Sequence, residues 1–148
     1  MVDKIQNDLK KAQLDRDEVK VSTLRLLLSE IKNTQIAKQA KNGLLDQDII
    51  SIIQKEIKKR KEAILGFRSG GREESAQKEE KEADILQVYL PAQLSNEELT
   101  KIVEQYITET GATSIVDMGK VISIVMGKVK GQADGGMVSA IVKEKLTK

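Results

Sequence analysis

Apolar residues recur three and four positions apart along most of this chain, which is the spacing of one face of an α-helix. One such stripe, near the C-terminus, consists of Val121, Ile122, Val125, Met126 and Val129. Another, in the first third of the chain, consists of Val21, Leu24, Leu27, Leu28, Ile31 and Ile36. The pattern predicts an all-α protein.

Residues 1–91 are expected to form an N-terminal helical domain of about four helices. The first is short and breaks near residues 14–17, where Asp17 is a plausible N-cap of the second. The second is expected to end at Asn42-Gly43, because both residue types tolerate the left-handed conformation of a helix exit. A third helix is expected to begin at Asp46 or Asp48.

A turn at Ser69-Gly70-Gly71 separates the third predicted helix from a fourth. The first half of the fourth helix is almost entirely polar, which favours a segment that projects from the bundle or borders a partner. This helix is expected to end before Pro91, since the residue preceding proline disfavours helical dihedral angles.

A second, smaller domain is expected over residues 95–148. Ser95 and Glu98 have the spacing of a capping box, in which each side chain binds the backbone amide of the other residue. Apolar spacing after this signal predicts three helices. The C-terminal domain should therefore be a compact three-helix bundle.

The last two predicted helices meet at a corner rich in glycine and lysine. Gly131 follows Lys128 and Lys130, as a glycine commonly follows the cations at a helix C-terminus. Asp134 then precedes Gly135 and Gly136 as a predicted N-cap. We expect a helix–turn–helix whose corner exposes backbone amides, small residues and lysines, which suits docking against a polyanion or another backbone.

The composition excludes several kinds of chemistry. The 148 residues include no Cys and no His, which removes thiol nucleophiles, imidazole bases and the usual zinc ligands. We therefore expect no metal and no cofactor. The absence of Cys, of a targeting-type N-terminal segment and of an apolar run of about 18 residues leads us to expect a cytoplasmic protein without a membrane span.

Other charged and glycine-rich segments indicate no catalytic site. Glu79, Glu80, Glu82 and Asp84 fan out around one predicted helix, so we interpret them as a solvated face. The serines lie in no nucleophile-elbow motif, and the glycine segment at residues 127–136 lacks the ending of a phosphate-binding loop. We expect no catalytic residue.

Two basic features remain open. The run Lys55, Lys58, Lys59, Arg60 and Lys61 is either a solvated helix face or a strip that contacts phosphates. Arg25 lies within an apolar stripe, so we expect a structural ion pair with Glu30, Glu56 or Asp84. The net charge of +2 does not by itself indicate a nucleic-acid binder, although lysines are enriched after residue 111.

Three blocks of the chain, at residues 21–37, 58–99 and 117–138, together resemble the GatB/YqeY family, in order and nearly end to end. The specific combination is Arg25, Glu30-Ile31-Lys32-Asn33, Tyr89-Leu90-Pro91, Gly119-Lys120, Lys130-Gly131 and Asp134-Gly135. The chain departs from the family pattern at two places: residues 72–75 stand where an Asp-Leu pair is common, and Gly127 stands where proline is common. The likeness is strongest to free-standing bacterial members.

The resemblance implies a helical N-terminal domain and a smaller helical C-terminal domain. In fused relatives these form the tail of the GatB component of the glutamine-dependent aspartyl/glutamyl-tRNA amidotransferase, where the tail helps to grip the tRNA body. The family is described with carbon–nitrogen ligase activity that uses glutamine as amido donor.

The leading hypothesis is a non-catalytic protein that binds tRNA, by shape and phosphate recognition, or that binds a tRNA-bearing enzyme. The residues expected to contact RNA are Lys120, Lys128, Lys130, Gly131, Gly135 and Gly136. The first alternative is a protein–protein adaptor, and the second is an accessory amidotransferase activity. The oligomeric state does not follow from the sequence.

Overall fold

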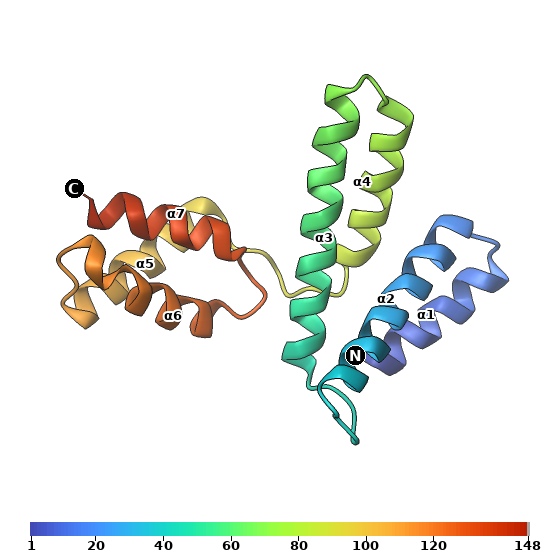
Figure 1. Cartoon of the computed structure of the whole chain (residues 1–148), viewed down its shortest axis with the longest axis horizontal. Helices are drawn as coiled ribbons and strands as arrows, with labels where there is room; N and C mark the ends of the chain where they lie inside the picture. The colour runs from blue at the N-terminus through green and yellow to red at the C-terminus, as the bar shows by residue number, and fades with distance from the viewer. Residues whose placement is uncertain (148) are drawn as a thin grey trace. The chain divides into compact units, whose positions relative to one another are not determined.

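The computed structural model describes residues 1–147, which form seven α-helices and one short 3₁₀ helix, with no strand among them (Figure 1). The prediction of an all-α protein is confirmed. Contacts within the chain define two compact units, Met1–Leu90 and Pro91–Lys148. Each unit has its own hydrophobic core and is described by itself.

The N-terminal unit consists of two packed helical pairs. Its helices are α1 (Val2–Leu14), α2 (Glu18–Ala37), α3 (Asp46–Ser69) and α4 (Glu73–Gln87). Helix α1 packs on α2, α3 packs along α4, and α2 contacts both α3 and α4. The core between them is built mainly from aliphatic side chains: Ile5, Leu24, Leu27, Ile31, Ile49, Ile53, Ile57, Leu86 and Tyr89.

The α3–α4 pair is longer than the part of the core that it shares with α1 and α2. Figure 1 shows that the end carrying the α3–α4 turn extends past the other two helices. In this turn Gly71 adopts a φ of +74°, which explains a glycine at that position of the predicted turn. The polar first half of α4 lies against α3 and buries Ala76 completely.

Three sequence predictions for α2 are wrong: its C-terminal end, the place of Ile36 on the apolar stripe and the ion pair of Arg25. The helix ends at Ala37, five residues before the predicted Asn42-Gly43 exit, and Gln39 has a φ of +53° in the turn that follows. Ile36, which the apolar stripe included, is 65% exposed in the last turn of α2. Arg25 is exposed to solvent and forms no ion pair within residues 1–147.

The C-terminal unit is a bundle of three α-helices. It contains α5 (Asn96–Thr110), the 3₁₀ helix η1 (Ile115–Asp117), α6 (Met118–Val129) and α7 (Gly135–Leu146). All three α-helices pack on one another around a small aliphatic core. Its buried members are Leu99, Val103, Val121, Val125, Val129, Ala133, Val138, Ile141, Val142 and Leu146.

The helix starts read from polar residues are confirmed at several positions. Asp17 accepts a hydrogen bond from the Lys20 amide at 3.2 Å, and Asp134 accepts one from the Gly136 amide at 3.3 Å. In the capping box, Ser95 Oγ accepts from the Glu98 amide at 3.1 Å while the Ser95 amide donates to Glu98 Oε2 at 2.9 Å. Local side-chain chemistry therefore fixes these three N-termini.

Candidate nucleic-acid interface

The outer face of α6 is an open surface of the C-terminal unit. Val121, Val125 and Val129 fill the core, so the opposite side of the helix faces solvent. That side carries Gly119, Ser123 and Gly127, which recur every four residues. A Cβ atom added at Gly119 or at Gly127 would meet no atom within 4 Å. We call this surface the α6 outer face.

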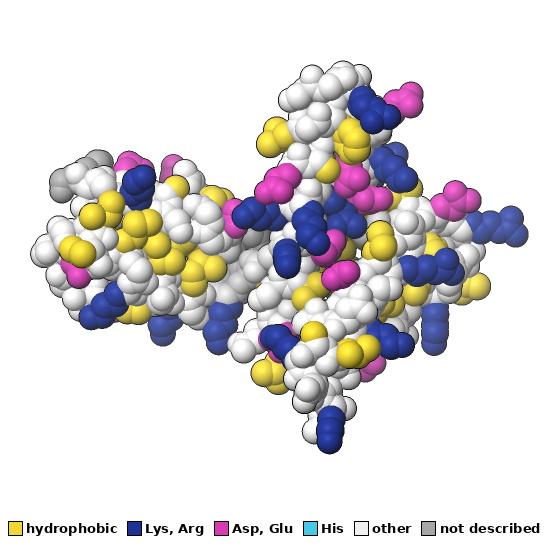
Figure 2. Space-filling model, in the orientation of Figure 1, with side chains coloured by type: hydrophobic (Ala, Val, Ile, Leu, Met, Phe, Trp, Pro, Cys, Tyr) yellow, Lys and Arg dark blue, Asp and Glu magenta, His cyan; other side chains and the backbone are white. Residues whose placement is uncertain are grey.

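Lysines surround the α6 outer face. Lys120, Lys128 and Lys130 are all exposed, and none forms an ion pair within the part of the chain that the structure describes. In contrast, Lys145 of α7 lies 2.8 Å from Glu104 Oε1, whose hydrogen bond raises the pKa of Lys145. Figure 2 shows basic side chains, all of them lysines in this unit, along the α6 side. Lys148 is one of the lysines that enrich the chain after residue 111, and it lies outside the described residues.

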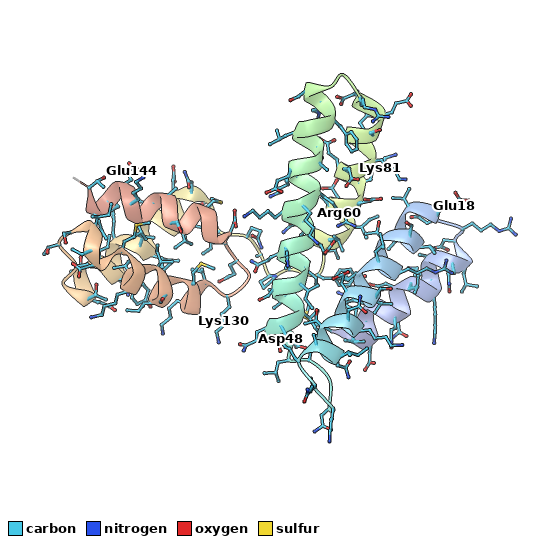
Figure 3. All side chains as sticks on the ribbon, viewed as in Figure 1. Glu18, Asp48, Arg60, Lys81, Lys130 and Glu144 are labelled. Atoms are coloured by element: carbon cyan, nitrogen blue, oxygen red, sulfur yellow. The ribbon has the colours of Figure 1, made fainter. Side chains whose placement is uncertain are left out.

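Gly131 is buried in the loop between α6 and α7, not exposed at a corner. Its φ of +75° lets the chain turn after α6. The side-chain amide of Gln93 donates to the Gly131 carbonyl at 2.7 Å, and the Leu94 amide donates to the Gln132 carbonyl at 2.8 Å. We call residues 93–94 with the loop that they bind the 93–94 clamp. It covers Gly131, while Lys130 stays exposed at the end of α6 (Figure 3).

The start of α7 also differs from the expected anion site. The Gly136 amide binds the Asp134 carboxylate, which places a negative charge where a phosphate was expected. A Cβ atom on Gly136 would lie 3.3 Å from Asp134 Oδ2, and one on Gly135 would lie 3.8 Å from Met126 Cε. Gly136 therefore leaves room for the capping carboxylate, whereas a Cβ atom at Gly135 would make only ordinary van der Waals contact with Met126. Their predicted contact with RNA stays a prediction.

The structure thus separates the six predicted site residues into two groups. The three lysines lie around one exposed surface, whereas the three glycines occupy the loop and the α7 start, with Gly131 buried. Sequence reasoning did not assign Gly119, Ser123 and Gly127 to that surface. Their spacing of four residues opposite the Val121–Val129 stripe was the signal available for it.

A buried ionic cluster lies in the N-terminal unit, between α3 and α4. Arg60 is 7% exposed, and its Nη1 atom lies 2.9 Å from Glu56 Oε2 while its Nε atom lies 3.3 Å from Glu82 Oε2 (Figure 3). Burial raises the pKa of Glu79, and the neighbouring Glu82 carboxylate raises it further. The interpretation of Glu82 as part of a solvated face is wrong, since Glu82 is 8% exposed. The buried Arg60 fits neither of the two interpretations left open for its basic run.

Glu56 is held in its charged form by this cluster. Burial alone would raise the pKa of Glu56, but hydrogen bonds from Arg60 and Lys59 outweigh it and lower the pKa below its usual value. The cluster joins α3 to α4 by charge. We interpret it as a structural clamp.

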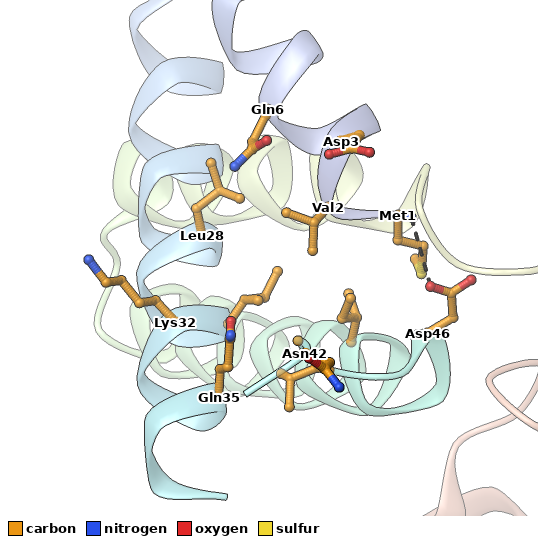
Figure 4. A pocket seen from close by; sticks show the side chains of 13 residues that line it. Met1, Val2, Asp3, Gln6, Leu28, Lys32, Gln35, Asn42 and Asp46 are labelled. Carbon is orange, nitrogen blue, oxygen red and sulfur yellow. Dashed lines mark ion pairs between the residues drawn. The ribbon is translucent and has the colours of Figure 1, made fainter. Parts of the chain in front are cut away.

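A hollow of about 600 Å³ lies between the start of α1, the C-terminal part of α2 and the loop before α3 (Figure 4). Apolar side chains, including Leu28 and Ile31, line part of it, and polar groups such as Gln6, Gln35 and Asn42 line the rest. The Met1 α-amino group lies 3.8 Å from Asp46 Oδ1 across its edge. Because apolar and polar side chains are mixed in its lining, the hollow does not point to a particular ligand or reaction.

Within residues 1–147, no group of three or more potential ligand side chains could hold a metal ion. In the same range, no helix combines the length and apolarity needed to cross a bilayer. The arrangement offers exposed cations and open backbone, without a nucleophile–base pair in the sites described above.

Comparison with known proteins bears on this arrangement. The family model described as "Yqey-like protein" matches residues 2–146. The chain belongs to the YqeY-like family. The resemblance to the tail of the amidotransferase component GatB is consistent with this membership.

Three relatives of this YqeY-like chain carry the name "Altered inheritance of mitochondria protein 41, mitochondrial". The Pyrenophora tritici-repentis protein is 33% identical over 95% of this chain and 78% of its own length. The Eremothecium gossypii protein is 37% identical over 74% of this chain and 60% of its own length. The Vanderwaltozyma polyspora protein is 35% identical over 71% of this chain and 57% of its own length.

The expected cytoplasmic location is contradicted by these relatives, whose names point to mitochondria. The expectation used the lack of cysteine and of a targeting-type segment. Neither property separates the cytoplasm from an organelle, because targeting segments are removed from mature proteins and many proteins lack disulfides in either place. The likeness to bacterial members is likewise not shown, since these relatives are fungal.

Proposed function

We propose that this YqeY-like protein binds tRNA without catalysing a reaction, and that the α6 outer face with Lys120, Lys128 and Lys130 is the contact surface. The observation that carries the proposal is that these three lysines are exposed and lack ion pairs within residues 1–147. A lysine without a carboxylate partner can neutralise a phosphate without first breaking an ion pair.

The shape of the surface supports the same ligand. Gly119, Ser123 and Gly127 keep the middle of the face low, so a sugar–phosphate backbone can approach the helix closely. Lys120 and Lys128 are eight residues apart in one helix, which separates them by about 12 Å along its axis. Recognition is then by shape and phosphate, because this face carries no aromatic side chain that could stack on a base.

The family membership supports the choice of tRNA among nucleic acids. Fused relatives that the sequence resembles contain this region as the tail of the GatB component of a tRNA-dependent amidotransferase. Assistance to a tRNA-bearing enzyme is compatible with the same surface. Because the curated relatives are named as mitochondrial proteins, mitochondrial tRNA is the first RNA to compare with bulk tRNA.

The test is equilibrium binding of the protein to tRNA and to double-stranded DNA of equal length, across a salt series. We expect salt-dependent binding that prefers tRNA. The variant Lys120→Glu/Lys130→Glu should weaken it and lower the slope of log affinity against log salt by about 1 for each lost phosphate contact. Lys101→Glu is the matched control, because Lys101 is an exposed lysine of α5. Equal binding to both nucleic acids, or unchanged binding by the α6 variant, would refute the proposal.

A protein–protein adaptor is the second candidate, and exposed apolar residues beside α6 favour it. Val116 is 87% exposed and Ile115 is 49% exposed, and both immediately precede the α6 outer face. A partner helix could pack against the small residues there. Such binding would be insensitive to salt and to the lysine variants, and Gly127→Leu would abolish it.

A further inference from the structure

Arg16 occupies a backbone position that normally favours glycine. Its φ is +57° at the end of α1. The Arg16 amide donates to the Gln13 carbonyl at 3.2 Å, and the Asp17 amide donates to the Ala12 carbonyl at 3.0 Å. These two bonds form a Schellman motif, in which the left-handed residue is usually glycine because a Cβ atom is strained there. The backbone of Arg16 is therefore held in the left-handed conformation at a cost in stability.

Arg16 lines a surface hollow that a second arginine, Arg25, also lines. Arg25 approaches it from the second turn of α2, together with Ser22 and Val21, while Gln13 lines it from α1. The hollow thus combines two guanidinium groups with a side-chain amide and a hydroxyl. Glu18 is the one acidic residue that lines it, so the lining has a net positive charge.

Neither arginine is neutralised by a carboxylate. Within residues 1–147 Arg16 and Arg25 form no ion pair, whereas Arg68 lies 2.5 Å from Glu80 Oε1 and 3.3 Å from Glu73 Oε1. Arg60 is paired as well, at 2.9 Å from Glu56. The two arginines of the hollow are thus available to an external anion. A guanidinium matches phosphate oxygens with two parallel hydrogen bonds.

We propose that Arg16 and Arg25 bind a backbone phosphate of RNA in this hollow, with Ser22 and Gln13 as neutral donors. The inference rests on the proposed function and adds to it a phosphate contact on the N-terminal unit. A phosphate within a polymer fits better than a free phosphate ion. The four donor side chains are all exposed, and a shallow site holds a ligand best when other contacts keep that ligand in place.

The strain at Arg16 gives a test that separates binding from folding. Arg16→Gly removes the guanidinium and relieves the left-handed strain, so its thermal midpoint should equal or exceed that of the wild type. Its affinity for tRNA should nevertheless fall by about threefold, the order expected for one exposed charge pair. Arg25→Gln changes an exposed residue and should give a similar loss. Arg72→Gln is the matched control, because Arg72 is exposed and lies over the Phe67 ring.

Failure of this inference differs from failure of the proposed function. If wild-type protein does not bind tRNA, both are wrong. If the Lys120→Glu/Lys130→Glu variant binds weakly while Arg16→Gly and Arg25→Gln bind as the wild type does, only the arginine hollow is refuted. An NMR titration with inorganic phosphate tests whether the hollow binds a free phosphate ion instead of an RNA phosphate. Saturable shifts at Ser22 that vanish in Arg25→Gln, together with unchanged tRNA affinity in that variant, would identify a free-anion site and overturn the RNA assignment.

Discussion

The phenol of Tyr89 donates a hydrogen bond to Asp8 Oδ2 at 2.5 Å, joining two residues that are 81 positions apart. Tyr89 lies just after α4, and Asp8 lies in the middle of α1, so the bond ties the end of the N-terminal unit to its first helix. The Lys4 ammonium lies 5.6 Å from the centre of the Tyr89 ring, which adds a cation–π contact to the same junction.

Removing this hydroxyl should destabilise the N-terminal unit. Tyr89→Phe keeps the buried ring and loses the bond to a carboxylate, and we expect a loss of about 1–2 kcal/mol in the free energy of unfolding. Urea denaturation followed by circular dichroism measures it. The control is Tyr106→Phe, whose hydroxyl makes no hydrogen bond within residues 1–147 and which should cost much less. Equal effects would show that the Asp8 bond contributes nothing.

The same junction predicts an alkaline instability. Burial raises the pKa of Tyr89 above its ordinary value of 10.0, and the bond to Asp8 raises it further. The folded state therefore keeps a proton that the unfolded chain loses. The contribution of the Tyr89 hydroxyl to the free energy of unfolding is complete below about pH 10 and falls as the pH rises above that value. Urea midpoints between pH 8 and pH 11 should decline less in Tyr89→Phe than in the wild type. Parallel declines would contradict the prediction.

The ionic cluster around Arg60 predicts that the free energy of unfolding depends strongly on keeping its charges paired. Arg60→Met leaves Glu56 and Glu82 partly buried near one another, and we expect a loss of about 3 kcal/mol. In Arg60→Met/Glu82→Leu, Glu56 keeps Lys59 as partner, at 3.3 Å, and much of the loss should be recovered. Urea denaturation of both variants and of Glu82→Leu completes a double-mutant cycle. Additive losses would mean that the two residues do not interact.

Two glycines near the α6–α7 loop should respond in opposite directions to alanine. Gly131→Ala forces a Cβ atom onto a residue with a φ of +75°, which should cost about 1–2 kcal/mol. Gly127→Ala places a methyl group in open space on a helix interior and should stabilise the unit by up to about 1 kcal/mol. Thermal unfolding of both variants checks the sign. A stabilised Gly131→Ala would show that the left-handed turn is not required.

The helices of this chain could be predicted because their signals are local. Asp17, Ser95 and Asp134 each cap a helix within three residues of their own position, so the sequence contains the whole interaction. The valine stripe of α6 likewise needs only its own spacing. The end of α2 was placed too late because Gln39, a residue without a special preference, adopts the left-handed turn before Asn42-Gly43 is reached.

The site could be predicted only in part, because burial there depends on distant residues. The lysines around α6 follow from the sequence, but the buried Gly131 accepts a hydrogen bond from Gln93, 38 positions earlier. The burial of Arg60 similarly requires Glu82 from another helix. Glu56, four residues before Arg60, was the only local sign that this arginine differs from its basic neighbours.

The 93–94 clamp decides where the C-terminal unit can be cut from the chain. A fragment beginning at Ser95 would keep all three helices, yet the Gly131 and Gln132 carbonyls would lose the donors supplied by Gln93 and Leu94. The turn beside Lys130 would then lose its hydrogen-bonded anchor. A separately expressed C-terminal unit should therefore start at or before Pro91. If a shorter fragment fails to bind RNA, the lost hydrogen bonds to the α6–α7 loop explain the failure as well as a missing RNA site does.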